Sequence, residues 1–174
     1  QSVSKLILVD CTIPGTENSD ALHGGSWHYG FHMAPEIPEM LTKGREKEYI
    51  RTQIKVWSFN KRAIDEDAID EYVKHYAKNG GMTAGFNYYR TLKEDAALVE
   101  TFQNQKLLMP VLTITGQHSV GDKLPKALEK EATSLKRIIV ANSGHFVPEE
   151  APEIFNLSVL KFLGSKGNSD QNKN

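Results

Sequence analysis

The residue of this sequence best suited to chemistry is a histidine that lies on a glycine turn. Ser143-Gly144-His145 follows an apolar run at 137–141, and Pro148 begins the helical segment that comes next and is expected to hold the turn rigid. Open α/β sheets carry reactive groups at the carboxyl ends of their strands, where an imidazole acts as an acid or a base. An isolated turn histidine more often only caps neighbouring groups, so the spacing alone leaves both roles open.

Three apolar runs predict the strands that would position such a turn. They lie at residues 5–10, 110–115 and 137–141. Runs without alternation are typical of strands that are buried on both faces of a parallel sheet. Helical patterns follow two of them, at 123–133 and 152–163. The order strand, helix, strand, helix therefore predicts an α/β fold with a parallel sheet covered by helices.

The stretch between the first two strands has a different character. About ninety residues there carry helical patterns at 45–59, 67–78 and 83–103. Acidic residues near the start of the second pattern and Gly80-Gly81 after it are signals of a helix beginning and ending. We predict a mostly helical insertion between strands of the sheet.

Composition excludes several classes of protein. The 174 residues carry 21 Lys and Arg against 22 Asp and Glu, and this balance gives no general attraction to nucleic acid or to anionic lipid. The longest apolar runs, Leu6–Val9 and Ile138–Ala141, are too short to span a membrane. A single cysteine, Cys11, excludes an internal disulfide framework and a cysteine-based zinc site. With no signal-peptide pattern in the residues given, a cytoplasmic location is expected.

The sheet that these strands form is too small to stand alone. An apolar strand needs neighbouring strands and covering helices, and this sequence supplies too few of either. We expect the chain to be the C-terminal part of a larger fold, whose sheet another polypeptide segment completes beside residues 5–10.

The order and spacing of several short motifs resemble the α/β-hydrolase family, and in particular its epoxide hydrolase and haloacid-dehalogenase-like members with a helical cap. Gly144-His145 with Pro148-Glu149 and Pro152-Glu153 is similar to the segment that carries the catalytic histidine. The other matching segments are Leu6–Asp10 with Pro14-Gly15 (sixth strand and start of the cap), Trp27–His32 with Pro35–Glu39 (first cap segment), Ala84–Arg90 (later cap helix) and Met109–Leu112 with Gly116 (the strand before the usual acid).

The resemblance implies a division of the chain. Residues 1–15 would hold a core strand and the lead into the cap, 16–105 the helical cap, and 106–165 the C-terminal strands and helices of the hydrolase core. The polar residues 166–174 are expected to be a frayed tail. The nucleophile elbow and the oxyanion loop of the family would lie upstream, in an N-terminal part of the same fold.

In the family a carboxylate or a serine attacks the substrate and forms an ester, which a histidine-activated water then hydrolyses. The resemblance gives the role of base to His145. Gln117–Gly121 is one residue away from the G-x-S-x-G elbow, but only one helix and one strand separate Ser119 from His145. That position matches the acid turn of the family, so we do not assign Ser119 as the nucleophile.

The acid that orients His145 stays open between two residues. The family usually has Asp where this chain has Ser119. Asp122 lies three residues later, although it would also serve as the N-cap of the next helix. Asp10 ends the first strand, where some haloalkane dehalogenases carry their acid, and from there it can reach His145 across the sheet. We favour Asp10, whose alternative role is a buried carboxylate bonded to loop amides.

The resemblance also implies a substrate-binding group in the cap, made by Trp27, His28, Tyr29 and Tyr89. Opening an epoxide or expelling a halide builds negative charge, which such donors stabilise. A Tyr at position 29, where fluoroacetate-dehalogenase-like enzymes have Trp, favours epoxide or ester chemistry. Alternatively, the aromatic side chains only pack between cap and core, which is expected of at least half of Trp27, Tyr29, Tyr88 and Tyr89. His28 and His32 have a zinc-compatible spacing but no third ligand, so no metal is predicted.

Together these features predict a hydrolase that acts on a small apolar substrate, most simply an epoxide, without a cofactor. Two alternatives stay open: a catalytically lapsed protein of this fold that binds a ligand, and an esterase on the same scaffold. The identity of the upstream nucleophile, Asp or Ser, would separate epoxide from ester chemistry. The expected partner is the N-terminal part of the same fold, and a homodimer is left open.

Overall fold

A computed structural model describes residues 2–15, 27–102 and 104–164, and it divides the chain into two compact units. The first unit combines Gln1–Cys11 with Asn104–Asn174, and the second is Thr12–Gln103. The frayed tail expected at 166–174 lies outside the described residues. None of the described helices is long and apolar enough to cross a membrane.

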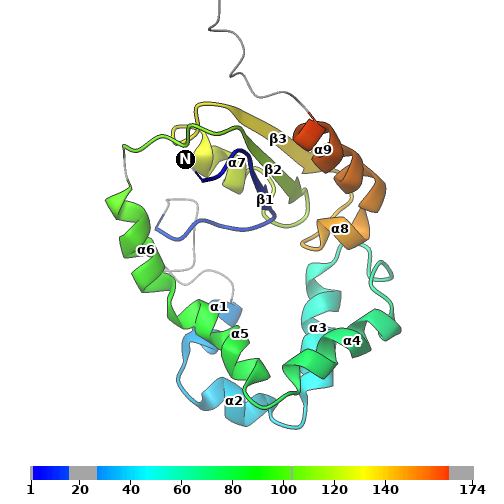
Figure 1. Ribbon diagram of the computed structural model, residues 1–174. Helices are drawn as coiled ribbons and strands as arrows, with labels where there is room; N and C mark the ends of the chain where they lie inside the picture. The colour runs from blue at the N-terminus through cyan, green and yellow to red at the C-terminus, as the bar shows by residue number, and fades with distance from the viewer. Residues whose placement is uncertain (1, 16–26, 103, 165–174) are drawn as a thin grey trace, which may run out of the picture. The chain divides into compact units, whose positions relative to one another are not determined.

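The first unit is built on a parallel sheet with the strand order β1-β2-β3, as Figure 1 shows. The strands are β1 (Leu6–Val9), β2 (Val111–Gly116) and β3 (Leu135–Val140). The parallel strands predicted from the three apolar runs are therefore confirmed. β2 is buried along its whole length because it has a strand on either side.

Burial of β3 differs from the sequence prediction. A strand buried on both faces was expected at 137–141, but Lys136, Arg137 and Ile139 are exposed and only Val140 is buried. Among the described residues β3 forms one border of the sheet. Fewer groups therefore cover it than cover β2.

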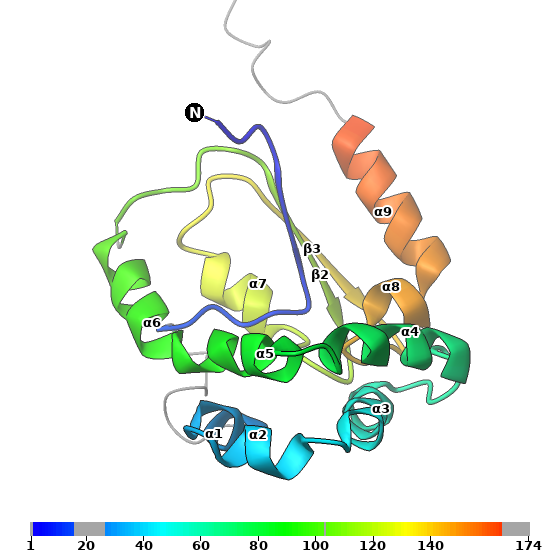
Figure 2. The ribbon, with the colours of Figure 1, turned by 60° about the horizontal axis from the view of Figure 1, so that its bottom comes forward.

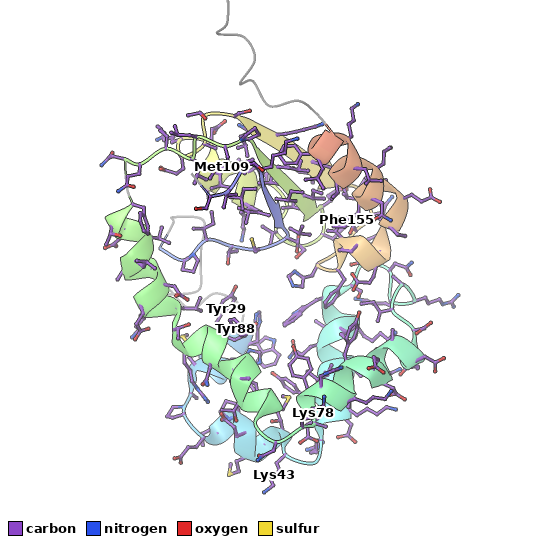
Figure 3. All side chains as sticks on the ribbon, viewed as in Figure 1. Tyr29, Lys43, Lys78, Tyr88, Met109 and Phe155 are labelled. Carbon is purple, nitrogen blue, oxygen red and sulfur yellow. The ribbon has the colours of Figure 1, made fainter. Side chains whose placement is uncertain are left out.

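Helices lie on both sides of this sheet, with α7 (Lys123–Leu128) on one side and α9 (Pro152–Gly164) on the other, as Figure 2 shows. The short helix α8 (Val147–Glu150) precedes α9. A core cluster forms between the sheet and α9, and Phe155, labelled in Figure 3, packs against it. Its buried members are Leu112, Ile114, Val140, Val147 and Phe162.

The predicted helix at 152–163 is confirmed by α9, but the one at 123–133 is too long. Helix α7 ends at Leu128 because the chain then pairs with the segment before β2. The amide of Leu107 donates to the carbonyl of Glu131 at 2.7 Å, and the amide of Thr133 donates to the carbonyl of Leu107 at 3.1 Å. These two hydrogen bonds take the place of a further helical turn.

The second unit is helical, and none of its described residues forms a strand. Its helices are α1 (Trp27–Met33), α2 (Ile37–Thr42), α3 (Glu46–Trp57), α4 (Glu66–Tyr76), α5 (Gly81–Arg90) and α6 (Leu92–Thr101). Helix α5 packs against α1, α2, α4 and α6 and buries Met82 and Phe86. Arg90 at its end makes two hydrogen bonds to the Glu39 carboxylate, at 2.8 and 2.9 Å, and so ties α5 to α2.

The single helix predicted over 83–103 is in fact two helices that meet at Thr91. The Thr91 hydroxyl bonds to the carbonyl of Tyr88 at 3.3 Å and to the Asp95 carboxylate at 3.2 Å. A threonine side chain that bonds locally competes with the helical backbone, which explains the break. The helices predicted at 45–59 and 67–78 correspond to α3 and α4.

Two strand ends of the first unit approach each other closely at Gly116, the last residue of β2. A Cβ atom at Gly116 would lie 1.9 Å from the Gly144 carbonyl oxygen and 2.7 Å from that of Ser143. The amide of His118 also donates to the Ser143 carbonyl at 3.0 Å. The turn after β3, which carries His145, is therefore packed directly on the end of β2.

We expect Gly116→Ala to lower the free energy of unfolding. Overpacking a core typically costs roughly 1–3 kcal/mol, and the loss here should reach or exceed the upper end, because backbone atoms cannot move aside as a flexible side chain would. Urea denaturation of the full-length protein measures the effect. Gly164→Ala is the control, since a Cβ there meets nothing within 4 Å. Equal stability of the two variants would contradict the close packing of the two turns.

Candidate active site

The candidate residues of the first unit lie in the turns at the carboxyl ends of the three strands. Asp10 follows β1, Ser119 lies in the turn after β2, and His145 lies in the turn after β3. The parallel register pairs Val9 with Ile114 and Ile114 with Ile138, so that these turns meet at one edge of the sheet. This edge is where open α/β sheets carry their functional groups.

Asp10 is the centre of this group. Its backbone has φ 40, in the left-handed region that few residues other than glycine adopt, and its amide donates to the Ile114 carbonyl at 2.9 Å. The residue is 1% exposed. A buried carboxylate needs hydrogen-bond donors. The amide of Gly116 donates to Oδ1 at 2.7 Å, and the Ser119 hydroxyl donates to Oδ2 at 2.7 Å.

His145 is the third partner of the same carboxylate. Its Nδ1 lies 2.7 Å from Oδ2 of Asp10, while its side chain is 41% exposed. An ionised carboxylate only accepts hydrogen bonds, so the proton of this contact belongs to Nδ1. The lone pair is then on Nε2, which can take a proton from a reacting group. The contact also stabilises the imidazolium that such a transfer forms.

The turn that carries His145 is held by a carboxylate that sequence reasoning missed. Oε1 of Glu150 accepts hydrogen bonds from the amide of Gly144 at 3.0 Å and from that of Phe146 at 3.2 Å. These two amides stand on either side of His145. The sequence predicted that the start of the following helix would hold the turn. In the structure the Glu150 side chain, in the first turn of α8, holds it. An acidic residue in the first turn of a helix, next to a glycine turn, is the signal that was available.

The other candidate acid, Asp122, has a different partner. Its carboxylate forms an ion pair with Lys126, one helical turn further along α7, and this partner lowers the pKa of Asp122. It stands at the N-cap position of α7 without a side-chain capping bond. The structure thus brings Asp10, and not Asp122, to His145. The catalytic role of either residue stays a prediction.

The cap candidates of the second unit form an aromatic cluster between α1 and α5, in the region where Tyr29 is labelled in Figure 3. The ring of His28 lies 4.6 Å from that of Tyr29 and 5.7 Å from that of Tyr89, centroid to centroid, and the two tyrosine rings are 5.3 Å apart. Trp27 is at the border of the cluster, 6.1 Å from His28, and is 64% exposed. The structure therefore gathers all four predicted residues within one unit.

Two more residues that the sequence did not assign extend this cluster inward. Nε2 of His32 lies 2.5 Å from the Tyr49 hydroxyl, and the ring of His32 is 4.3 Å from that of Tyr89. Burial, with a smaller effect of His28, lowers the pKa of His32 to about 4, and burial raises the pKa values of Tyr49 and Tyr89 to about 12. At neutral pH the imidazole is therefore uncharged and both phenols keep their protons.

Comparison with known proteins gives relatives over most of the chain. The chain is 34% identical to a soluble epoxide hydrolase of Corynebacterium sp. (strain C12) over 108 residues. These are 62% of this chain and 37% of the relative. The crystal structure of Cfl2 from Burkholderia cenocepacia is 31% identical and superposes with a TM-score of 0.82, covering 92% of this chain and 57% of that one. The structure of the epoxide hydrolase CorEH is 28% identical with a TM-score of 0.80 and covers 92% and 59%. No family model matches the chain.

The fold, the position of the site at the strand ends and these relatives all point to the same superfamily. The chain belongs to the α/β-hydrolase superfamily, and its three-stranded parallel sheet with a helical insertion is part of that fold. It spans between 37% and 48% of the length of the curated relatives that it matches.

The lowered pKa of the buried His32 imidazole predicts a pH-dependent stability. The pKa of His32 is about 4 in the folded state and 6.5 in an unperturbed chain, so the unfolded state binds more protons in between. Stability should therefore fall as the pH drops from 6.5 toward 4, by up to about 3 kcal/mol. Urea denaturation at pH 7 and pH 5 measures this loss. His32→Phe should reduce it, whereas the exposed His75→Gln should not.

Proposed function

We propose that the protein is a hydrolase that opens epoxides, or cleaves a related small apolar substrate, through a covalent ester that a histidine-activated water hydrolyses. The observation that carries this proposal is the 2.7 Å contact between Nδ1 of His145 and the buried carboxylate of Asp10. Relatives described as epoxide hydrolases support the choice of substrate.

In the first step a nucleophilic carboxylate, carried by a segment outside this chain, attacks a carbon of the epoxide. A carbon–oxygen bond of the ring breaks, and negative charge develops on the ring oxygen. Tyr89, Tyr29 and His28 are the donors assigned to this oxygen. Burial and neighbouring tyrosines raise the pKa of Tyr89 to about 12, so its hydroxyl carries a proton to donate at neutral pH.

In the second step Nε2 of His145 takes a proton from a water molecule, whose oxygen attacks the carbonyl of the ester. The bond to the alkyl oxygen breaks, and the imidazolium returns its proton to that oxygen to give a diol. The carboxylic acid left on the nucleophile then loses the second proton of the water, which replaces the proton donated in the first step. Asp10 compensates the charge of the imidazolium and holds the ring, because Oδ2 faces Nδ1. Typically, loss of such a carboxylate costs about 10⁴ in kcat.

The contact between His145 and Asp10 also bears on the two alternative functions, a ligand-binding protein without activity and an esterase. The lapsed, ligand-binding alternative rests on Ser119, which stands where the family usually has its acid. A carboxylate from another strand next to His145 argues against that alternative and supports the proposal. An esterase would use the same pair and differ in the nucleophile, a serine in place of a carboxylate.

We also propose that an N-terminal part of the same hydrolase fold covers the first unit. The apolar side chains of Ile154, Leu157, Leu160 and Leu163 on α9 are between 49% and 69% exposed. A helix that is apolar all round is normally buried on all sides. In the described residues β1 pairs only with β2, so its other edge is open. The greater length of the relatives supports a covering segment that also brings the nucleophile.

The proposed mechanism predicts which step each variant of the full-length protein blocks. His145→Ala should still form the ester with an epoxide but fail to hydrolyse it, so that mass spectrometry detects a covalent adduct. Asp10→Asn should lower kcat by about 10⁴. Asp122→Asn is the matched control and should change kcat little, since its partner is Lys126. Equal losses in the two Asp→Asn variants would contradict the role of Asp10.

The covering segment predicts that α9 is sensitive to charge. In the full-length protein Leu157→Lys should lower the free energy of unfolding by about 3 kcal/mol or more, because it buries an unpaired ammonium group. Asn156→Lys, one residue away and also exposed in this unit, is the control and should be nearly neutral. If urea denaturation gives the same midpoint for both, this face of α9 is open to solvent and the proposal fails.

A further inference from the structure

The Ser119 hydroxyl bonds to the same carboxylate oxygen that faces the histidine. Its Oγ lies 2.7 Å from Oδ2 of Asp10, and Nδ1 of His145 lies 2.7 Å from that oxygen. The other oxygen, Oδ1, accepts from the backbone amide of Gly116. The carboxylate thus has donors on both of its oxygens, and they come from the ends of two other strands.

Ser119 is itself held by backbone bonds of the turn after β2. Its amide donates to the Gly116 carbonyl at 3.1 Å, and the amide of Gly121 donates to the same oxygen at 3.0 Å. The Thr115 hydroxyl closes the turn by donating to the Gly121 carbonyl at 2.6 Å. The hydroxyl of Ser119 is therefore presented to Asp10 by a fixed loop, and the bond to Oδ2 needs little ordering of the side chain.

The geometry of a carboxylate explains what this second donor does. The plane of the carboxylate can rotate about the Cβ–Cγ bond, and a single donor on Oδ1 leaves that rotation only partly restricted. A donor on Oδ2 fixes the plane, so that one lone pair of Oδ2 stays directed at Nδ1 of His145. Because Ser119 is neutral, it takes no net charge from the carboxylate that stabilises the imidazolium.

We infer that Ser119 is a positioning residue for the acid of the site, acting through Asp10 on His145. The inference rests on the proposed function and adds a third member to its acid–base pair. The role is specific to the step in which His145 removes a proton from water, which is hydrolysis of the ester. Formation of the ester uses the nucleophile and the cap donors, so it should not depend on Ser119.

The experiment separates the two steps in the full-length protein. Ser119→Ala should slow hydrolysis of the ester by roughly ten- to a hundredfold, the usual effect of losing a hydrogen bond to a charged group, and leave the rate of ester formation unchanged. Ser119→Thr keeps a hydroxyl and should restore most of the hydrolysis rate. Ser134→Ala, an exposed serine before β3, is the control. Rapid-quench measurements with an epoxide give both rates.

A second measurement does not depend on turnover. We expect the proton between Nδ1 of His145 and Asp10 to give a downfield resonance in NMR spectra, which Ser119→Ala should shift or broaden and Ser119→Thr should preserve. Unchanged hydrolysis and an unchanged resonance in Ser119→Ala would overturn the inference, and so would an equal loss in both steps. If Asp10→Asn leaves hydrolysis unchanged, the proposed function itself fails, which distinguishes the two outcomes.

Discussion

A buried carboxylate is the group on which the arrangement of the first unit depends. Asp10 is 1% exposed and is bonded to Gly116, Ser119 and His145. Burying an ionised carboxylate is costly unless donors surround it, so the ends of all three strands must keep their positions for the fold to tolerate it. The same requirement gives His145 its orientation. Stability and the proposed chemistry thus rest on one group.

The backbone around Asp10 has unusual conformations and close contacts that bring the three strand ends together. Asp10 has a positive φ, as does Asn142 just after β3, and both types tolerate the left-handed region better than most. Gly116 allows the Ser143-Gly144 backbone to approach β2 where no larger residue would fit. Glu150 then holds the amides on both sides of His145. Two residues with positive φ, Asp10 and Asn142, thus lie next to the site, where unusual backbone conformations commonly serve a function.

In the second unit burial acts on side chains that stay uncharged, and no buried ion pair is needed to stabilise them. In its aromatic cluster burial lowers the pKa of His32 and raises those of Tyr49 and Tyr89, so these three side chains are uncharged at neutral pH. Neutral phenols are the donors that an oxygen with developing negative charge requires. The first unit therefore brings a carboxylate to an imidazole, and the second keeps an imidazole and two phenols uncharged.

The sequence by itself determined the three strands, the main helices and the turn histidine, because apolar runs, helical periodicity and glycine turns are local signals. It left Asp10 and Asp122 open as partners of His145, since both follow strands in the chain. Only the parallel register, which brings the ends of β1, β2 and β3 to one edge, decided for Asp10, while Lys126 engages Asp122. The break at Thr91, the early end of α7 and the roles of Glu150 and Ser119 likewise depend on single side-chain or backbone contacts, which no periodic pattern encodes.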